Sequence, residues 1–203
     1  MLDHGTNALL SPEDINGAED LIASSDVVLS VLAIEPATAH RGMALARKHG
    51  VVSVLNPASA QMLDDALLAE VDVLTPNESE LRILSGLAPD DPAESVELSH
   101  ALQRRGVSDL VVTRGSKGAL VVSADGKTVR VPGHAVEVVD TTGAGDAFNA
   151  ALGVGLAEGL PLLDAVRFAT GAGALACTRL GVIPALPERA AVEAVTGQSA
   201  NTT

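Results

Sequence analysis

The sequence contains no tryptophan, no tyrosine and only two phenylalanines, Phe148 and Phe168, among its 203 residues. Because 47% of the residues are nevertheless hydrophobic, we expect a core built from Ala, Val, Leu and Ile. A chain of this length suits one ordinary domain, which buries about 70% of the surface that its unfolded chain exposes.

Other absences exclude whole classes of protein. Cys177 is the single cysteine, which excludes an internal disulfide bond and a cysteine-ligated zinc site. No charge-free stretch approaches the ~18–20 apolar residues of a membrane span, and residues 1–4 lack the basic and apolar regions of a signal peptide. Thirteen Lys and Arg against 26 Asp and Glu give a net charge of −13, which disfavours nucleic acid as a partner. We therefore expect a soluble, cytoplasmic protein with no nucleic-acid or membrane partner.

Short β-branched runs alternate with longer amphipathic runs, a pattern that is typical of βαβ units. Runs that are apolar on both faces predict buried parallel strands, and they cover residues 27–32, 51–55, 71–74 and 110–113. Helices are expected over 36–49 and 92–105. Ser11-Pro12 has the residues of a helix start, with a serine cap and a proline in the first position.

The pattern changes in the last part of the chain. Asp125-Gly126 predicts a hairpin turn between strands at 118–123 and 128–131. A strand at 135–139 is then followed by expected helices at about 143–158, at about 161–178 and from about 187. We predict one α/β domain over residues 1–196, with a mostly parallel sheet flanked by helices on both faces, and a disordered tail at 197–203.

One run carries a chemical signal: Asp140-Thr141-Thr142-Gly143-Ala144-Gly145-Asp146. Glycines at the start of a helix expose backbone amides, and the helix dipole favours an anion there. Asp146 would lie in the first helical turn beside that anion site. An acid in that position also stabilises a helix without any chemical role.

This run resembles the C-terminal signature of the ribokinase/PfkB carbohydrate kinases, and three further segments match that family in order and spacing. Asn77-Glu78-Ser79-Glu80 resembles its Asn-x-x-Glu magnesium motif, residues 113–118 resemble its nucleotide loop, and residues 178–184 resemble the segment after its last nucleotide-binding helix. The resemblance covers essentially the whole chain. It implies a ribokinase-like fold, truncated at the N-terminus, and transfer of the γ-phosphoryl group of ATP to the primary hydroxyl of D-ribose.

The resemblance also implies roles for single residues. Asp146 matches the catalytic base, and Glu35 falls where ribokinases place a glutamate that contacts the sugar. The backbone anion hole matches Gly143, Ala144 and Gly145. The ATP site matches Asn77, Thr113, Arg114, Gly115, Ser116, Lys117, Gly118, Gly145, Asp146 and Thr170.

Two cation sites belong to the same resemblance. Asn77 and Glu80 match the residues that position Mg²⁺ and its waters. The monovalent-cation site, which would hold K⁺, matches Asp140, Thr142, Ala176, Arg179, Gly181 and Ala185. The family pattern often has serine where Ala185 stands, so a hydroxyl ligand is missing here.

Each of these assignments has a plainer structural alternative. Asn77 and Glu80 have the spacing of a solvated helix cap, Glu35 before a proline suits a helix-entry acid, and Arg179 suits the neutralisation of a helix C-terminus. Cys177 is expected to be a small buried core residue. No metal-ligand spacing links the histidines, which are expected on the surface: His4, His40, His49, His100 and His134.

Members of this family are longer, and the part without a counterpart here is the N-terminal one, which carries a β-sheet lid over the sugar and a Gly-Gly motif. This sequence has 19 glycines and no Gly-Gly pair. Two alternatives to an active kinase therefore stay open. One is a non-catalytic nucleotide-binding fragment, and the other is an interaction module whose partner is a separate lid-bearing chain; a homodimer is a further option.

Overall fold

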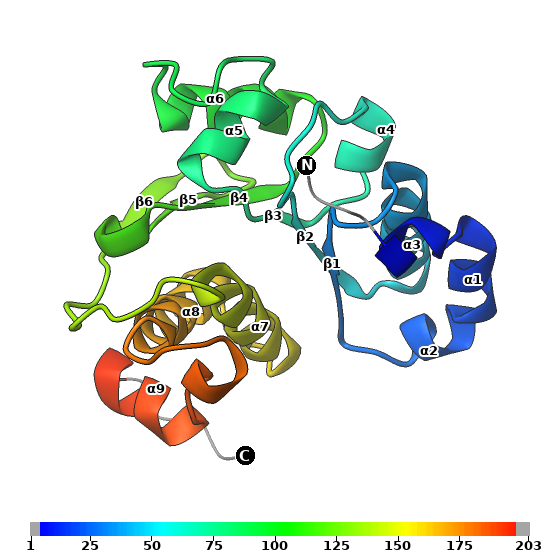
Figure 1. Ribbon diagram of the computed structural model, residues 1–203. Helices are drawn as coiled ribbons and strands as arrows, with labels where there is room; N and C mark the ends of the chain where they lie inside the picture. Colours follow the sequence, from blue (N-terminus) through cyan, green and yellow to red (C-terminus); the bar gives the residue numbers. More distant parts are fainter. Residues whose placement is uncertain (1–4, 198–203) are drawn as a thin grey trace. The chain divides into compact units, whose positions relative to one another are not determined.

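The computed structural model describes residues 5–197 and confirms the expected α/β class (Figure 1). The chain forms two compact units. The first unit comprises the residues up to 112 together with 121–128, and the second comprises 113–120 together with the residues from 129 onward. His4 and the expected tail, apart from Gly197, lie outside the described residues.

Six strands form one sheet in the order of the sequence. The first four pair with one another in parallel, as the apolar runs predict. The strands are β1 (Val27–Val31), β2 (Val52–Asn56), β3 (Val73–Leu74), β4 (Asp109–Thr113), β5 (Ala119–Val122) and β6 (Thr128–Val131).

The turn between β5 and β6 confirms the expected hairpin. Gly126 adopts a φ of 79° and donates its N–H to the Ser123 carbonyl at 2.7 Å, while the Ser123 N–H bonds to the Lys127 carbonyl at 2.9 Å. A connection this short joins antiparallel strands. The sheet is therefore parallel over β1 to β4 and ends in a hairpin.

The strand expected at 135–139 does not form, which corrects the prediction for that segment. Its backbone is satisfied elsewhere: the N–H groups of Val139 and Asp140 both point to the Cys177 carbonyl, at 2.8 and 3.2 Å. Val138 and Val139 are 60% and 56% exposed, so this apolar run does not mark a buried strand.

The helices of the first unit begin and end at local signals. Ser11 and Asp14 form the capping box that opens α1, and Gly50, with a φ of 69°, ends α3 in the left-handed conformation. Helix α3 packs against β1, β2, α1 and α2. The helical segments of this unit are η1 (Gly5–Leu9), α1 (Pro12–Gly17), α2 (Glu19–Ala23), α3 (Pro36–His49), α4 (Asp65–Leu68), α5 (Glu78–Leu84) and α6 (Ser95–Arg104).

Strand β1 lies at the edge of the sheet. None of its five residues is fully buried, and Leu29 is 40% exposed. The three central residues of β2, in contrast, are all buried. A parallel strand is normally covered on both faces and paired on both sides, so β1 is less protected than its inner neighbour β2.

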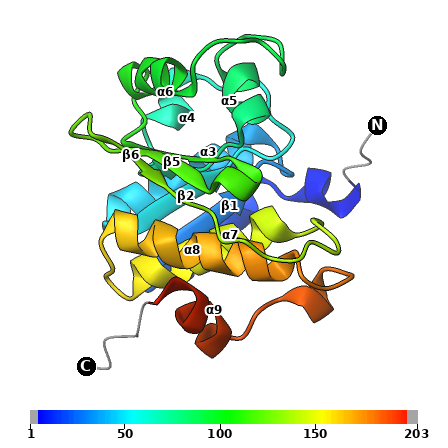
Figure 2. The same cartoon turned by 90° about the vertical axis from the view of Figure 1, so that its left-hand side faces the viewer.

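In the second unit, α7 and α8 lie side by side and α9 packs against α8 (Figure 2). The close approach depends on glycine, because a Cβ on Gly155 of α7 would stand 3.0 Å from the Ala165 Cβ, and one on Gly171 of α8 would stand 2.4 Å from the Thr196 Cγ2. The helical segments of this unit are η2 (Gly115–Lys117), α7 (Ala144–Ala157), α8 (Leu162–Ala176), η3 (Ile183–Ala185) and α9 (Arg189–Thr196).

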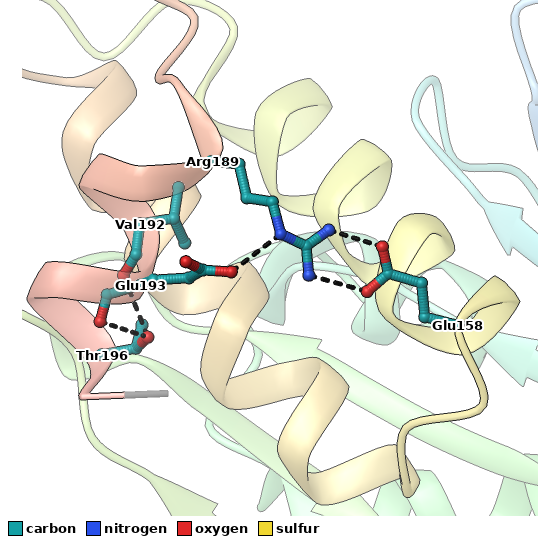
Figure 3. Close-up of polar contacts among 5 residues, drawn as sticks. All are labelled: Glu158, Arg189, Val192, Glu193 and Thr196. Carbon is teal, nitrogen blue, oxygen red and sulfur yellow. Dashed lines mark hydrogen bonds and ion pairs between the residues drawn. The ribbon is translucent and has the colours of Figure 1, made fainter. Parts of the chain in front are cut away.

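An ionic clamp fastens α9 to α7 (Figure 3). The Arg189 guanidinium donates to both carboxylate oxygens of Glu158, at 2.5 and 2.8 Å, and through Nε to Glu193 at 2.8 Å. It also lies 5.5 Å from the ring centroid of Phe168 on α8. One side chain thus contacts all three helices of the second unit that exceed one turn.

The core consists of Leu, Val and Ala, supplemented by Met43, Phe148 and Phe168. The expected contribution of isoleucine is wrong, because no isoleucine in residues 5–197 is fully buried. The two phenylalanines lie on α7 and α8. Most of the core is therefore aliphatic, and its two aromatic rings belong to the α7–α8 helix pair.

Candidate functional site

The residues predicted to form an anion hole lie in and directly after the turn before α7. Gly143 caps the helix with a φ of 81°, and the Ala144 N–H bonds back to the Thr141 carbonyl at 3.2 Å. An added Cβ on Gly143 would stand 2.8 Å from the Val182 Cγ1, whereas one on Gly145 would meet no atom within 4 Å. The backbone at Gly145 is therefore open to a ligand.

Asp146 lies in the first turn of α7 and is exposed. Its carboxylate is thus accessible beside the positive end of the helix dipole, which favours an anionic side chain. The sequence predicts Asp146 in this first turn. The position suits a catalytic base and also suits an acid that only stabilises the helix, so it does not distinguish the two roles.

Asp140 connects this turn to the loop that follows α8. Its Oδ1 accepts from the Thr142 N–H at 2.9 Å and from the Thr142 hydroxyl at 2.7 Å, and its Oδ2 accepts from the Gly181 N–H at 3.2 Å. These bonds, led by the one from the Thr142 backbone, hold the pKa of the Asp140 carboxyl below its usual value. Three of the six residues predicted for the monovalent cation are thereby brought together.

The other three lie nearby in the chain but differ in exposure. Ala176 is buried in the last turn of α8, Ala185 is buried in η3, and Arg179 between them is exposed. Arg179 and Ala185 line a cavity of about 360 Å³ together with Thr178 and Glu188. The cavity is not lined by Asp140, Thr142, Ala176 or Gly181.

The predicted nucleotide loop starts at Thr113, the last residue of β4. The Arg114 N–H bonds to the Gly118 carbonyl at 2.8 Å, which closes the loop around η2. Gly118 has a φ of 84°, and a Cβ there would stand 2.1 Å from the Val131 carbonyl oxygen. The loop thus lies directly on the backbone that follows β6, in contact that only glycine permits.

Thr170, the remaining predicted ATP contact of the second unit, is 7% exposed on α8. Its hydroxyl donates to the Arg167 carbonyl at 2.7 Å, and His134 Nε2 lies 3.5 Å from the same oxygen. His134 was expected on the surface and is instead half-buried, as are His40 and His100. Cys177 is also half-buried rather than buried, and burial raises the pKa of its thiol.

Asn77 and Glu80 of the first unit form a capping box at the start of α5. The Asn77 Oδ1 accepts from the Glu80 N–H and the Glu80 Oε2 accepts from the Asn77 N–H, each at 2.8 Å. Partial burial raises the pKa of Glu80, and the bond from Asn77 opposes that rise. Asn77 and Glu80 therefore do form the helix cap that was the alternative to a magnesium motif. The other carboxylate oxygen of Glu80 lies outside this capping box.

Glu35 precedes Pro36 at the start of α3, and its exposed side chain makes no capping hydrogen bond. Its backbone carbonyl accepts from Thr38 and Ala39, at 2.9 and 3.1 Å. Glu35 follows β1 as Asn77 follows β3, so both residues lie beyond the carboxyl ends of parallel strands. That edge is where open α/β sheets bind ligands.

Asn56, at the carboxyl end of β2, was not singled out by sequence reasoning. Its Nδ2 donates to the Thr75 carbonyl at 3.3 Å and its Oδ1 accepts from the Ala58 N–H at 3.0 Å. The available signal was an Asn-Pro pair directly after an apolar strand. Asn56 thus fixes the start of the loop after β2, the strand that lies between those leading to Glu35 and Asn77.

A larger cavity, of about 740 Å³, lies at the amino ends of β2, β3 and β4 and contains none of the predicted residues; it is lined by Arg47, Val52, Asp72 and Ser108 among others. Within residues 5–197, no cluster of three or more His, Cys, Asp or Glu is arranged to hold a metal ion. No helix in that range is long and apolar enough to cross a membrane.

The parallel sheet with its C-terminal helix pair is a ribokinase-like fold. The chain belongs to the pfkB family of carbohydrate kinases, whose model matches residues 2–189. It is 36% identical over 189 residues to a ribokinase of Haemophilus influenzae, which covers 93% of this chain and 61% of that relative.

Two solved structures are similar over nearly the whole chain. A ribokinase from Thermotoga maritima superposes with a TM-score of 0.86 at 32% identity, covering 98% of this chain and 65% of that one. A ribokinase of Arabidopsis thaliana complexed with ribose and ATP gives a TM-score of 0.83 at 29% identity, covering 93% and 60%. The chain therefore spans less than two thirds of the length of these relatives.

Proposed function

We propose that this chain is the nucleotide-binding part of an ATP-dependent sugar kinase of the ribokinase type, which acts in the cytoplasm on D-ribose. The family match and the ribokinase relatives support the reaction class. The Arabidopsis structure, which contains ribose and ATP, supports the two substrates. The proposed partners are these small molecules.

The observation that carries the proposal is the turn at the start of α7, where the open backbone of Gly145 stands directly before the exposed carboxylate of Asp146. In the proposed reaction Asp146 takes the proton of the primary hydroxyl, whose oxygen forms a bond to the γ-phosphorus while the bond to the ADP oxygen breaks. The amides of Gly143, Ala144 and Gly145 stabilise the charge on the transferred group. Positioning and charge stabilisation are what phosphoryl transfer requires.

ATP binding is assigned to the loop 113–118 and to Thr170. The fold supports this assignment because the loop is held in a defined shape by the Arg114–Gly118 bond and by its contact with the Val131 backbone. Thr170 lies on the helix that packs against α7. Glu35 is proposed to contact the sugar together with Asp146.

Asn77 and Glu80 are proposed to hold Mg²⁺ and its waters. Oxygen donors suit this ion, which usually binds one or two carboxylates and keeps several waters. The Glu80 oxygen that lies outside the capping box fits such a contact. When bound, Mg²⁺ neutralises charge on the phosphates. K⁺ is not part of this proposal: Ala185 offers no side-chain oxygen at the edge of the site matched to it, and both oxygens of Asp140 already accept hydrogen bonds.

The coverage of the relatives favours a second candidate. The chain spans only 61% of the Haemophilus ribokinase. If the remaining part of such a kinase is essential for catalysis, this chain would act as a nucleotide-binding fragment or as a module that needs a separate lid-bearing chain. Nucleotide binding is common to the kinase and to the fragment, and it separates both from an interaction module.

Calorimetry with MgATP tests the shared property. Gly145→Val places a side chain where the structure is open, so the helix is retained while phosphate approach is blocked, and binding should be lost. Gly17→Val is the matched control, because Gly17 is also an exposed helical glycine whose added Cβ meets no atom within 4 Å. Equal affinity in the parent chain and the Gly145→Val variant would contradict the anion-hole assignment.

A further inference from the structure

The Asp140 carboxylate joins two segments of the second unit that are far apart in the sequence. Oδ1 holds the turn before α7 through Thr142, and Oδ2 holds the loop after α8 through the Gly181 N–H, 41 residues away. The next residue, Val182, packs on Gly143 so closely that a Cβ there would stand 2.8 Å from it. The bond to Gly181 therefore sets the position of Gly143, where the predicted anion hole begins.

Few side-chain oxygens are available to a cation here. Ala176, Arg179, Gly181 and Ala185 carry none, so Asp140 and Thr142 are the only side-chain ligands of the predicted set, and any others would have to be backbone carbonyls. Both oxygens of Asp140 accept hydrogen bonds from protein groups, and the Thr142 hydroxyl donates to one of them. Ala185, where the related pattern often has serine, presents a buried methyl group.

We propose that Asp140 is a positioning residue whose carboxylate, rather than bound K⁺, ties the turn before α7 to the loop after α8, so that this site has nearly the same structure and nucleotide affinity with or without K⁺. The part that concerns nucleotide rests on the proposed function. The part that concerns the two segments does not.

Amide hydrogen exchange measured by NMR on the full chain tests the link itself. The Gly181 amide should exchange at rates within about twofold in KCl and in choline chloride of equal ionic strength, because the carboxylate protects it in both. Protection at Gly181 that rises about tenfold or more in KCl would overturn the proposal. This comparison needs no variant.

Asp140→Asn supplies a second measurement. Its amide has a single acceptor oxygen, so only one of the two segments can stay bonded, and exchange at Thr142 or at Gly181 should accelerate about tenfold or more in both salts. Asp125→Asn is the matched control, because Asp125 also accepts from the N–H two residues on, at 3.1 Å, but lies in the β5–β6 turn. Unchanged exchange in Asp140→Asn would overturn the proposal.

Calorimetry with MgATP then separates the link from a ligand role. The affinity of the parent chain for MgATP should differ by less than about threefold between the two salts. Asp140→Asn should weaken that affinity by the same factor in both salts. A loss seen only in KCl would show that Asp140 acts through the cation, and would overturn the proposal. If the parent chain binds no nucleotide in either salt, the proposed function fails, while the exchange rates still decide whether the link exists.

Discussion

Arg189 forms a two-pronged ion pair with Glu158, in which Nη1 and Nη2 meet Oε1 and Oε2 at 2.5 and 2.8 Å (Figure 3). An acid at the C-terminal end of α7 is unfavourable for the helix dipole, and Arg189 offsets that cost. The contact lowers the pKa of Glu158 and raises that of Arg189. The planar fork of arginine matches a carboxylate in a way that lysine cannot.

Replacing Arg189 by methionine should therefore loosen α9. The loss is expected to be about 1 kcal/mol or less, since the pair is partly exposed and screened by salt, which corresponds to about 2–4 °C in the thermal midpoint. Lys127→Met is the control, because it breaks the exposed pair between Lys127 and Asp125 and should shift the midpoint little. Equal shifts in the two variants would contradict a special role for the clamp.

Gly118 and Gly115 provide a sharper pair of substitutions in one loop. Both have positive φ, 84° and 56°, but an added Cβ collides with the Val131 carbonyl oxygen only at Gly118. Gly115→Ala should cost about 1–2 kcal/mol, the strain of a left-handed conformation. Gly118→Ala must in addition displace the backbone after β6, so its free energy of unfolding should fall clearly further. Chemical denaturation followed by circular dichroism measures both, and equal losses would contradict the close contact.

Asp109 predicts a pH-dependent stability. Burial raises its pKa, and the N–H of Ala124, which donates to it at 2.8 Å, opposes that rise. Because the folded pKa exceeds the unfolded one, the folded state is relatively favoured at low pH and loses stability as the pH rises through the folded pKa. Asp109→Asn keeps an acceptor for Ala124 without the charge.

The Asn variant should consequently melt about 1–3 °C higher than the parent chain at pH 7. The difference should shrink toward zero below the unfolded pKa near 3.8, where Asp109 is protonated in both states. Thermal unfolding across that pH range checks the prediction. A variant that is less stable at neutral pH would show that the carboxylate is favourable where it lies.

The elements that could be predicted from the sequence are those whose ends are determined by residues at or next to those ends. Helix α3 runs from Pro36 to His49 as expected, because a proline fits its first turn and Gly50 ends it. The β5–β6 hairpin follows from Asp125-Gly126 in the same way. The segment 135–139 fails because the partner of its backbone, the Cys177 carbonyl, lies far along the chain.

The same distinction between local signals and tertiary contacts applies to the candidate site. The motif 140–146 and its helix start could be predicted from residue types, and so could the capping box of Asn77 and Glu80, which was one of two readings. The bond from Gly181 to Asp140 could not be predicted, because it depends on how α7 and α8 pack. The partial burial of His134 beside Thr170 could not be predicted either, because it depends on how the segment after β6 lies against α8.

Asp146→Asn should lower the rate in any preparation that shows ribose-dependent turnover. Loss of a general base typically costs about 10²–10⁴ in rate, while nucleotide affinity should change little because the backbone amides are retained. Asp164→Asn is the control, since Asp164 is the acid in the first turn of the neighbouring helix α8. Turnover of the Asp146 variant within about threefold of the parent would exclude Asp146 as the base.

The 203-residue chain by itself should not phosphorylate ribose at a useful rate. It spans only 61% of the Haemophilus ribokinase, and Glu35 is the only sugar contact that we assign besides Asp146. Transfer requires the hydroxyl oxygen to be held roughly 3–3.5 Å from the phosphorus, and good positioning is worth ~7–11 kcal/mol of the barrier. Losing half of that would slow the reaction on the order of 10³-fold. A coupled assay of ADP release, with saturating ribose and MgATP, measures this directly. Ribose-dependent turnover above ~1 s⁻¹, which is ordinary for an enzyme, would show that the residues present suffice to position the sugar.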